Sequence, residues 1–230
     1  MKSRTILNAI ACLAWAILFP VSISAQTETL DRILSRIDRV GANLKSMEAR
    51  IIQKKWTDIL EEYDTGEKGR FTFLRVDGKV HLRKDIDEPT VNHLVISDGT
   101  VTFYQPKIKQ AQEYKLGKHG DKAEFLLLGF GSNKDALREA YRIDLVGEEN
   151  INGRNTFHIE LKPKSDQVSA FFTSIHLWID AEMWVPIQQQ LVEPTHDHLL
   201  IRFEEIKLNP KMKKSHFNLK IPKEVKVIRN

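Results

Sequence analysis

The sequence has a single cysteine, Cys12, and that cysteine lies inside an apolar run near the N-terminus. Two basic residues precede the run, residues 6–21 form it, and the small residues 22–25 follow it. This order is typical of a secretory signal peptide, so we expect residues 1–25 to be cleaved after Ala25 or one residue earlier. An uncleaved membrane anchor is the alternative, which Pro20 and the small residues after the run disfavour.

Without this leader the chain has no cysteine, and this excludes both disulfides and thiol nucleophiles. We therefore expect an exported, periplasmic protein whose single domain, residues 26–230, is large enough to bury a core without disulfides. Hydrophobic residues make up 41% of the chain and charged residues 29%, as in an ordinary globular protein.

The sequence also has little net charge. The 35 basic and 31 acidic residues give +4, and removing Lys2 and Arg4 with the leader leaves 33 against 31, or +2. No basic stripe with interleaved aromatic residues stands out, so we expect no nucleic-acid partner.

Motifs of catalysis are missing too: there is no G-x-S-x-G, H-E-x-x-H, P-loop or G-x-G-x-x-G. His196 and His198 are two residues apart, as on one face of a strand, and His176 offers a third ligand for a metal. The signal is weak, because histidines on the polar face of a strand are usually solvated. We therefore expect no enzyme, no catalytic residues, no cofactor and no metal.

Among the segments that are present, residues 27–47 have apolar side chains at three- and four-residue spacing. This spacing predicts one amphipathic helix that packs on a sheet. A helix lying on a membrane surface is the alternative, but its polar face carries both acidic and basic residues rather than an excess of lysine and arginine.

From residue 48 the period changes to the alternation typical of strands, beginning with a long strand over residues 49–60. Tight turns follow at Asp77-Gly78, at Ser97–Thr100 and at Asn152-Gly153. We expect a mainly β (α+β) domain with about eleven short antiparallel strands. A sheet of that size tends to curl into a partial or closed barrel.

Residues 117–140 interrupt the strands. Residues 122–128 predict a short helix that is apolar on all sides and bounded by Gly129 and Gly131, and residues 133–140 predict a further helical turn. Two interpretations stay open at this point: a helix buried in the core, or a movable lid over an apolar cavity with the glycines as hinges.

Three motifs in order resemble the LolA family of periplasmic carriers for outer-membrane lipoproteins. The segment LVISDGTVTFYQPKIKQAQ resembles the family's hairpin through Ser97, Asp98, Gly99, Phe103, Tyr104, Pro106 and Gln110. The segment LWIDAEMWVPIQQ resembles its "WID…P" strand pair through Trp178, Ile179, Asp180 and Pro186. The ending FNLKIPKEVKVI resembles the family's last segment through Phe217, Pro222, Val225 and Val227.

The resemblance implies an unclosed antiparallel β-barrel with an N-terminal helix and a short helical lid over an apolar cavity. Such a cavity binds the acyl chains of lipoproteins, which the family receives from an inner-membrane ABC transporter and passes to an outer-membrane acceptor. On this resemblance we expect a monomer. The expected acyl-chain contacts are Phe71, Phe73, Leu82, Ile96, Phe103, Leu126, Leu127 and Phe130.

Typical members latch the lid with an arginine in the strand of the second hairpin. The best match here is His81, with Arg83 two residues further on the same face, and a histidine latch would be weaker and sensitive to pH. Two other hypotheses stay open: a lipid- or lipoprotein-sensing interaction domain on the same fold without transport, and a metal-dependent hydrolase that uses His176, His196 and His198.

Overall fold

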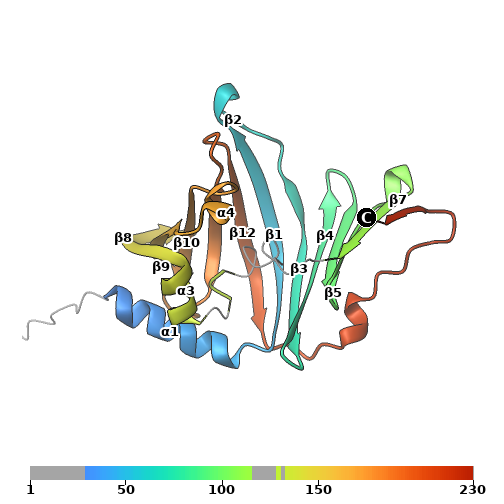
Figure 1. The fold of residues 1–230 in the computed structure, drawn as a ribbon. Coiled ribbons are helices and arrows are strands. Elements are labelled where there is room, and N and C mark those ends of the chain that lie inside the picture. The colour runs from blue at the N-terminus through green and yellow to red at the C-terminus, as the bar shows by residue number, and fades with distance from the viewer. Residues whose placement is uncertain (1–28, 116–127, 131–132, 230) are drawn as a thin grey trace, which may run out of the picture.

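The computed structural model describes residues 29–115, 128–130 and 133–229 (Figure 1). The expected signal peptide and the predicted helix up to residue 127 lie outside the described residues. The strands are β1 (Ser46–Thr57), β2 (Glu62–Tyr63), β3 (Glu67–Val76), β4 (Lys79–Glu88), β5 (Asn92–Ser97), β6 (Thr100–Gln105), β7 (Gln110–Lys115), β8 (Tyr141–Ile151), β9 (Arg154–Pro163), β10 (Ser174–Asp180), β11 (Pro186–Val192), β12 (His198–Leu208) and β13 (Lys226–Arg229). The helices are α1 (Leu30–Asn43), α3 (Lys134–Ala140) and α4 (Asp166–Ser169), with 3-10 turns η1 (Asp58–Leu60), η2 (Pro106–Ile108) and η3 (Lys214–Phe217).

All these strands belong to one sheet of thirteen strands, and its order is β13-β7-β6-β5-β4-β3-β1-β12-β11-β10-β9-β8 with β2 paired beside β1. Figure 1 shows the sheet curving strongly from β8 past β1 to β7. The outermost strands on this path, β13 and β8, are not paired with each other, so the barrel is unclosed, as the family resemblance implies. The structure describes thirteen strands where about eleven were expected, and β2 and β13 are the shortest of them.

The C-terminal segment departs from the expected antiparallel pairing. The turn η3 ends at Phe217, and only Lys226–Arg229 form a strand, which pairs parallel with β7. Phe217 is instead buried against Leu74 and Val95 on the outer face of the sheet. A large apolar side chain gains more from this burial than an exposed edge strand would offer it.

Helix α1 lies within the predicted segment 27–47 and buries the predicted apolar stripe, including Ile33, Leu34 and Ile37. It ends at Asn43 because Leu44 is extended. The Arg75 guanidinium donates to the carbonyl oxygens of Gly41 at 3.1 Å and of Leu44 at 3.3 Å. A cation at the negative end of the helix dipole stabilises this end and ties α1 to β3.

Helix α3 begins where the sequence predicts helix, because the Asn133 side chain accepts hydrogen bonds from the backbone N–H groups of Asp135 (2.9 Å) and Ala136 (3.2 Å). It packs beside α1, and Arg138 forms an ion pair with Asp31. In the described part of the chain, no helix combines the length and the apolar character that crossing a membrane requires.

Candidate functional site

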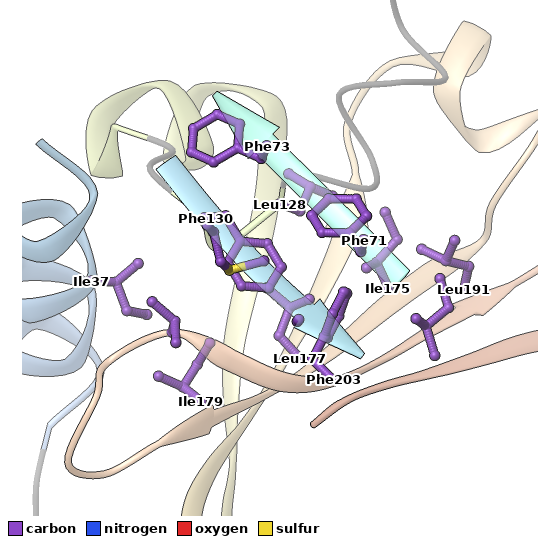
Figure 2. Packing of buried hydrophobic residues seen from close by; sticks show 14 of the residues in the cluster. Ile37, Phe71, Phe73, Leu128, Phe130, Ile175, Leu177, Ile179, Leu191 and Phe203 are labelled. Carbon is purple, nitrogen blue, oxygen red and sulfur yellow. The ribbon is translucent and has the colours of Figure 1, made fainter. Parts of the chain in front are cut away.

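The concave face of the sheet carries one continuous apolar cluster, which also takes in the buried stripe of α1. Side chains from β3 converge there with side chains from β10, β11 and β12, although β1 separates β3 from β12 in the sheet (Figure 2). The Phe71 ring lies 5.7 Å from the Phe203 ring, measured between centroids. Alternate residues of a strand point to opposite faces of a sheet, so the alternation of apolar and polar residues places the apolar side chains on one face only.

A short segment, Leu128–Phe130, fills the middle of the concave face; we call it the plug. The Phe130 side chain is 1% exposed, and its ring lies 5.0 Å from that of Phe203 and 6.4 Å from that of Phe71. Figure 2 shows Leu128 and Phe130 seated among the side chains of the strands. The plug therefore covers the middle of the apolar face.

Gly129 allows the plug to lie close to the sheet. Its φ is +82°, a conformation that favours glycine, and a Cβ atom there would lie 2.8 Å from Cγ of Pro186 and 3.3 Å from Cδ1 of Leu177. Both the backbone conformation and the space exclude a larger residue. The plug thus rests on the β10–β11 side of the sheet.

One polar side chain holds the plug in this apolar setting. The Gln189 amide donates from Nε2 to the carbonyl oxygen of Leu128 at 2.8 Å. Gln189 is 0% exposed, and its Cα partners on the neighbouring strands are Leu177 and Ile201. We did not predict this residue from the sequence, although its place between Ile187 and Leu191 in the alternation marks it as facing the core.

A second polar residue, Lys84, also faces the concave side of the sheet, because it lies directly opposite Phe71 of β3. The Lys84 ammonium donates to Oε1 of Gln53 at 3.3 Å, and the Gln53 amide in turn donates to Glu67. Burial lowers the pKa of Lys84, against the attraction of Glu67. In the pairing of β1 with β3, Met47 lies opposite Phe73 near α1, and Gln53 lies opposite Glu67 near η1. This polar cluster therefore lies at the end of the concave face that is farther from α1.

The structure brings together five of the predicted acyl-chain contacts, which all belong to the apolar cluster: Phe71, Phe73, Leu82, Ile96 and Phe130. Phe103 of β6 points to the same face of the sheet, but it is half-buried and does not belong to the cluster. Leu126 and Leu127 lie outside the described residues.

The two predicted latch residues lie on the other face. The Nδ1 atom of His81 lies 2.8 Å from Oγ of Ser97, and its ring lies 5.7 Å from that of Phe217. Arg83 donates to Oδ2 of Asp85 at 2.7 Å and to the carbonyl oxygen of His216 at 2.8 Å. The sheet separates both residues from the plug, and their contacts hold the C-terminal segment instead. The latch role of His81 and Arg83 stays a prediction from the resemblance.

Acid should destabilise this outer cluster through His81. Burial lowers the pKa of His81 below 6.5, aided by Lys214 and Lys79 and opposed by Asp98. The unfolded chain then binds the proton more readily, so the free energy of unfolding falls as the pH falls below about 6.5. We expect His81→Leu to lose less stability than the wild type in urea unfolding between about pH 7.5 and about pH 5.5.

Phe217→Leu is the matched control for this experiment, because it alters the same cluster without removing a titratable group. It should lower the free energy of unfolding at every pH and keep the wild-type pH dependence. A His81→Leu curve parallel to the wild-type curve would contradict the assignment.

The three histidines of the metal hypothesis do not meet. His176 pairs with His158 (Nδ1 to Nε2, 2.9 Å), and His198 pairs with the Tyr63 hydroxyl at 2.9 Å. The His196 side chain is largely exposed. Among the described residues, no three acidic or histidine side chains gather in a group that could hold a metal ion.

The fold is therefore an unclosed β-barrel whose apolar concave face is covered in its middle by the plug. The profile of one family, described as "Outer membrane lipoprotein carrier protein LolA", matches residues 42–220. The chain therefore belongs to the LolA family, as the sequence motifs predict.

Two relatives match most of the chain. An outer-membrane lipoprotein carrier protein of Chromohalobacter salexigens is 26% identical over 211 residues, which cover 91% of this chain and 91% of the relative. An uncharacterised protein of Methanocaldococcus jannaschii is 21% identical over 203 residues, which cover 88% of this chain and 55% of the relative. The chain thus spans about half the length of the archaeal relative.

Solved structures show the same fold. An uncharacterised conserved protein of Thermus thermophilus matches with a TM-score of 0.55 and 14% identity, over 87% of this chain and 98% of that one. MucB matches with a TM-score of 0.53 and 14% identity, over 86% of this chain and 64% of that one. At such low identity the likeness concerns the fold alone.

Proposed function

We propose that this protein is a periplasmic carrier that binds the acyl chains of lipoproteins on its concave face and moves them from the inner to the outer membrane. The observation that carries the proposal is the apolar face itself, which extends over several strands and is covered in its middle by the plug. Each CH₂ group transferred from water to such a surface contributes roughly 0.8 kcal/mol, so binding alone can shield a long acyl chain.

Membership of the family supports the direction of transport. A carrier of this kind would take lipoproteins from an inner-membrane ABC transporter and deliver them to an outer-membrane acceptor. The apolar run and small residues at the N-terminus support export by a cleavable signal peptide. The alternative is a lipid- or lipoprotein-sensing domain on the same fold, which would bind the same chains and never release them to an acceptor.

Phe103→Glu tests whether the concave face binds acyl chains. Phe103 is half-buried on that face, so a carboxylate there should leave the fold intact and disfavour an apolar ligand. We expect the affinity for a fluorescent acyl probe to fall about tenfold or more, because an acyl chain would then meet a charge that must stay hydrated.

The neighbouring residue offers a matched control. Tyr104 is also half-buried, but it points to the other face of β6, where its ring stacks on His93 at 5.8 Å. Tyr104→Glu should leave probe binding unchanged. Equal binding by the wild type and Phe103→Glu would show that the chains lie elsewhere.

A further inference from the structure

Gln189 is a fully buried amide on the apolar concave face, and only one of its two polar atoms is paired. Nε2 donates to the Leu128 carbonyl of the plug, whereas Oε1 has no hydrogen-bond partner among the described residues. The direction of this amide is fixed by chemistry, because a carbonyl oxygen can only accept and so must face the NH₂ group.

The residues that flank Gln189 on the concave face, on its own strand and on the two neighbouring strands, offer no substitute partner. Ile187 and Leu191 precede and follow it on the concave face of β11, and its Cα partners Leu177 and Ile201 are equally apolar and buried. A buried amide without hydrogen bonds is costly, because it has lost water and gained nothing in exchange. When an acyl chain displaces the plug, Nε2 also loses its acceptor, and both polar atoms of Gln189 are then unpaired.

The ligand itself can remove this cost. A plain hydrocarbon or an alkyl ether offers no strong partner for Nε2. An acyl ester and an acyl amide each offer a carbonyl that can replace the carbonyl of Leu128, and the amide oxygen is the stronger acceptor of the two. A site with buried polar groups discriminates strongly against ligands that leave those groups unpaired.

We propose that Gln189 determines the specificity of the concave face by recognising the carbonyl linkage of the acyl chain, with amide-linked chains preferred over ester-linked chains. This inference rests on the proposed acyl-chain binding and adds the chemistry of the linkage to it. Gln189 thereby has two successive roles. It holds the plug in the protein without ligand, and it forms a hydrogen bond with the carbonyl linkage of the ligand after the plug leaves.

Three probes of nearly equal length test the inference: N-methylhexadecanamide, methyl hexadecanoate and methyl hexadecyl ether. Each is titrated into the full chain to displace the hydrophobic dye N-phenyl-1-naphthylamine. We expect the wild type to bind the amide most tightly and the ether least tightly. The affinities for the amide and the ether should differ by about tenfold to a hundredfold, the range expected when a buried polar group is left unpaired.

Gln189→Met keeps the volume of the side chain and removes both polar atoms, so it should bind the three probes with nearly equal affinity. Gln188→Leu is the matched control, since Gln188 lies on the opposite face and accepts a hydrogen bond from Arg202 at 3.3 Å. Gln188→Leu should keep the wild-type order of affinities.

The outcomes separate this inference from the proposed function. If the wild type binds none of the probes, acyl-chain binding itself is contradicted. If it binds all three equally, or if Gln189→Met keeps the wild-type order, acyl-chain binding stands and the role of Gln189 is overturned. A variant that only loses stability and keeps its selectivity would assign Gln189 to the plug alone.

Discussion

Asp180→Ala should lower the free energy of unfolding by about 3 kcal/mol, because it removes a buried carboxylate that accepts three hydrogen bonds. Asp180 is 2% exposed. Its Oδ2 accepts from Arg154 at 2.6 Å, and its Oδ1 accepts from the backbone N–H groups of Glu182 at 3.0 Å and Met183 at 2.7 Å. Urea unfolding followed by tryptophan fluorescence measures the loss.

The effect should also reach the site. The backbone groups that Asp180 holds form the turn between β10 and β11, and β11 begins at Pro186, against which Gly129 of the plug packs. We therefore expect the acyl-probe affinity of Asp180→Ala to change as well. Glu182→Ala is the control, since its side chain is exposed and its backbone N–H remains. A loss as small as that of Glu182→Ala would show that the carboxylate does not hold the turn.

Hairpins could be predicted from local chemistry. Asp77-Gly78, Asp98-Gly99 and Asn152-Gly153 each have both residues at positive φ, the conformation these pairs favour in a two-residue turn. Once the turns are fixed, the alternation assigns each residue to a face of the sheet, and Leu82 and His81 accordingly lie on opposite faces. The apolar face therefore followed from the sequence alone.

Long-range packing could not be predicted in the same way. Alternation puts His81 and Arg83 opposite Leu82, but it does not say that η3 returns from the far end of the chain to cover them. The run Gln188–Gln190 is polar throughout, and the carbonyl that Gln189 meets belongs to a segment 61 residues earlier. Both contacts depend on how the sheet curves, which no local pattern encodes.

The sequence left two interpretations of the segment before Gly131, a core helix or a movable lid. The buried plug fits both, because a lid in its closed state is as buried as a core residue. The two interpretations differ in the free energy that is needed to move the plug off the concave face. For a lid, the binding of a ligand can supply that free energy, whereas a core residue leaves only when the protein unfolds.

Phe130→Ala distinguishes them, and we expect it to raise the affinity for an acyl probe. Phe→Ala substitutions in cores remove about 3 kcal/mol or more of packing free energy. If that energy holds the plug, its loss increases the fraction of molecules with an open concave face. The apparent dissociation constant falls in proportion, by up to about a hundredfold. Titration with the fluorescent probe, beside urea unfolding, measures both quantities.

Phe217→Ala is the matched control, because the Phe217 side chain is as fully buried as Phe130 but lies on the outer face of the sheet. It should lower the free energy of unfolding without raising the probe affinity. If Phe130→Ala instead binds the probe more weakly than the wild type, Phe130 contacts the acyl chain directly, as the family resemblance implies. Because the plug and the ligand use the same apolar surface, the sign of this change in affinity tells which of the two roles dominates.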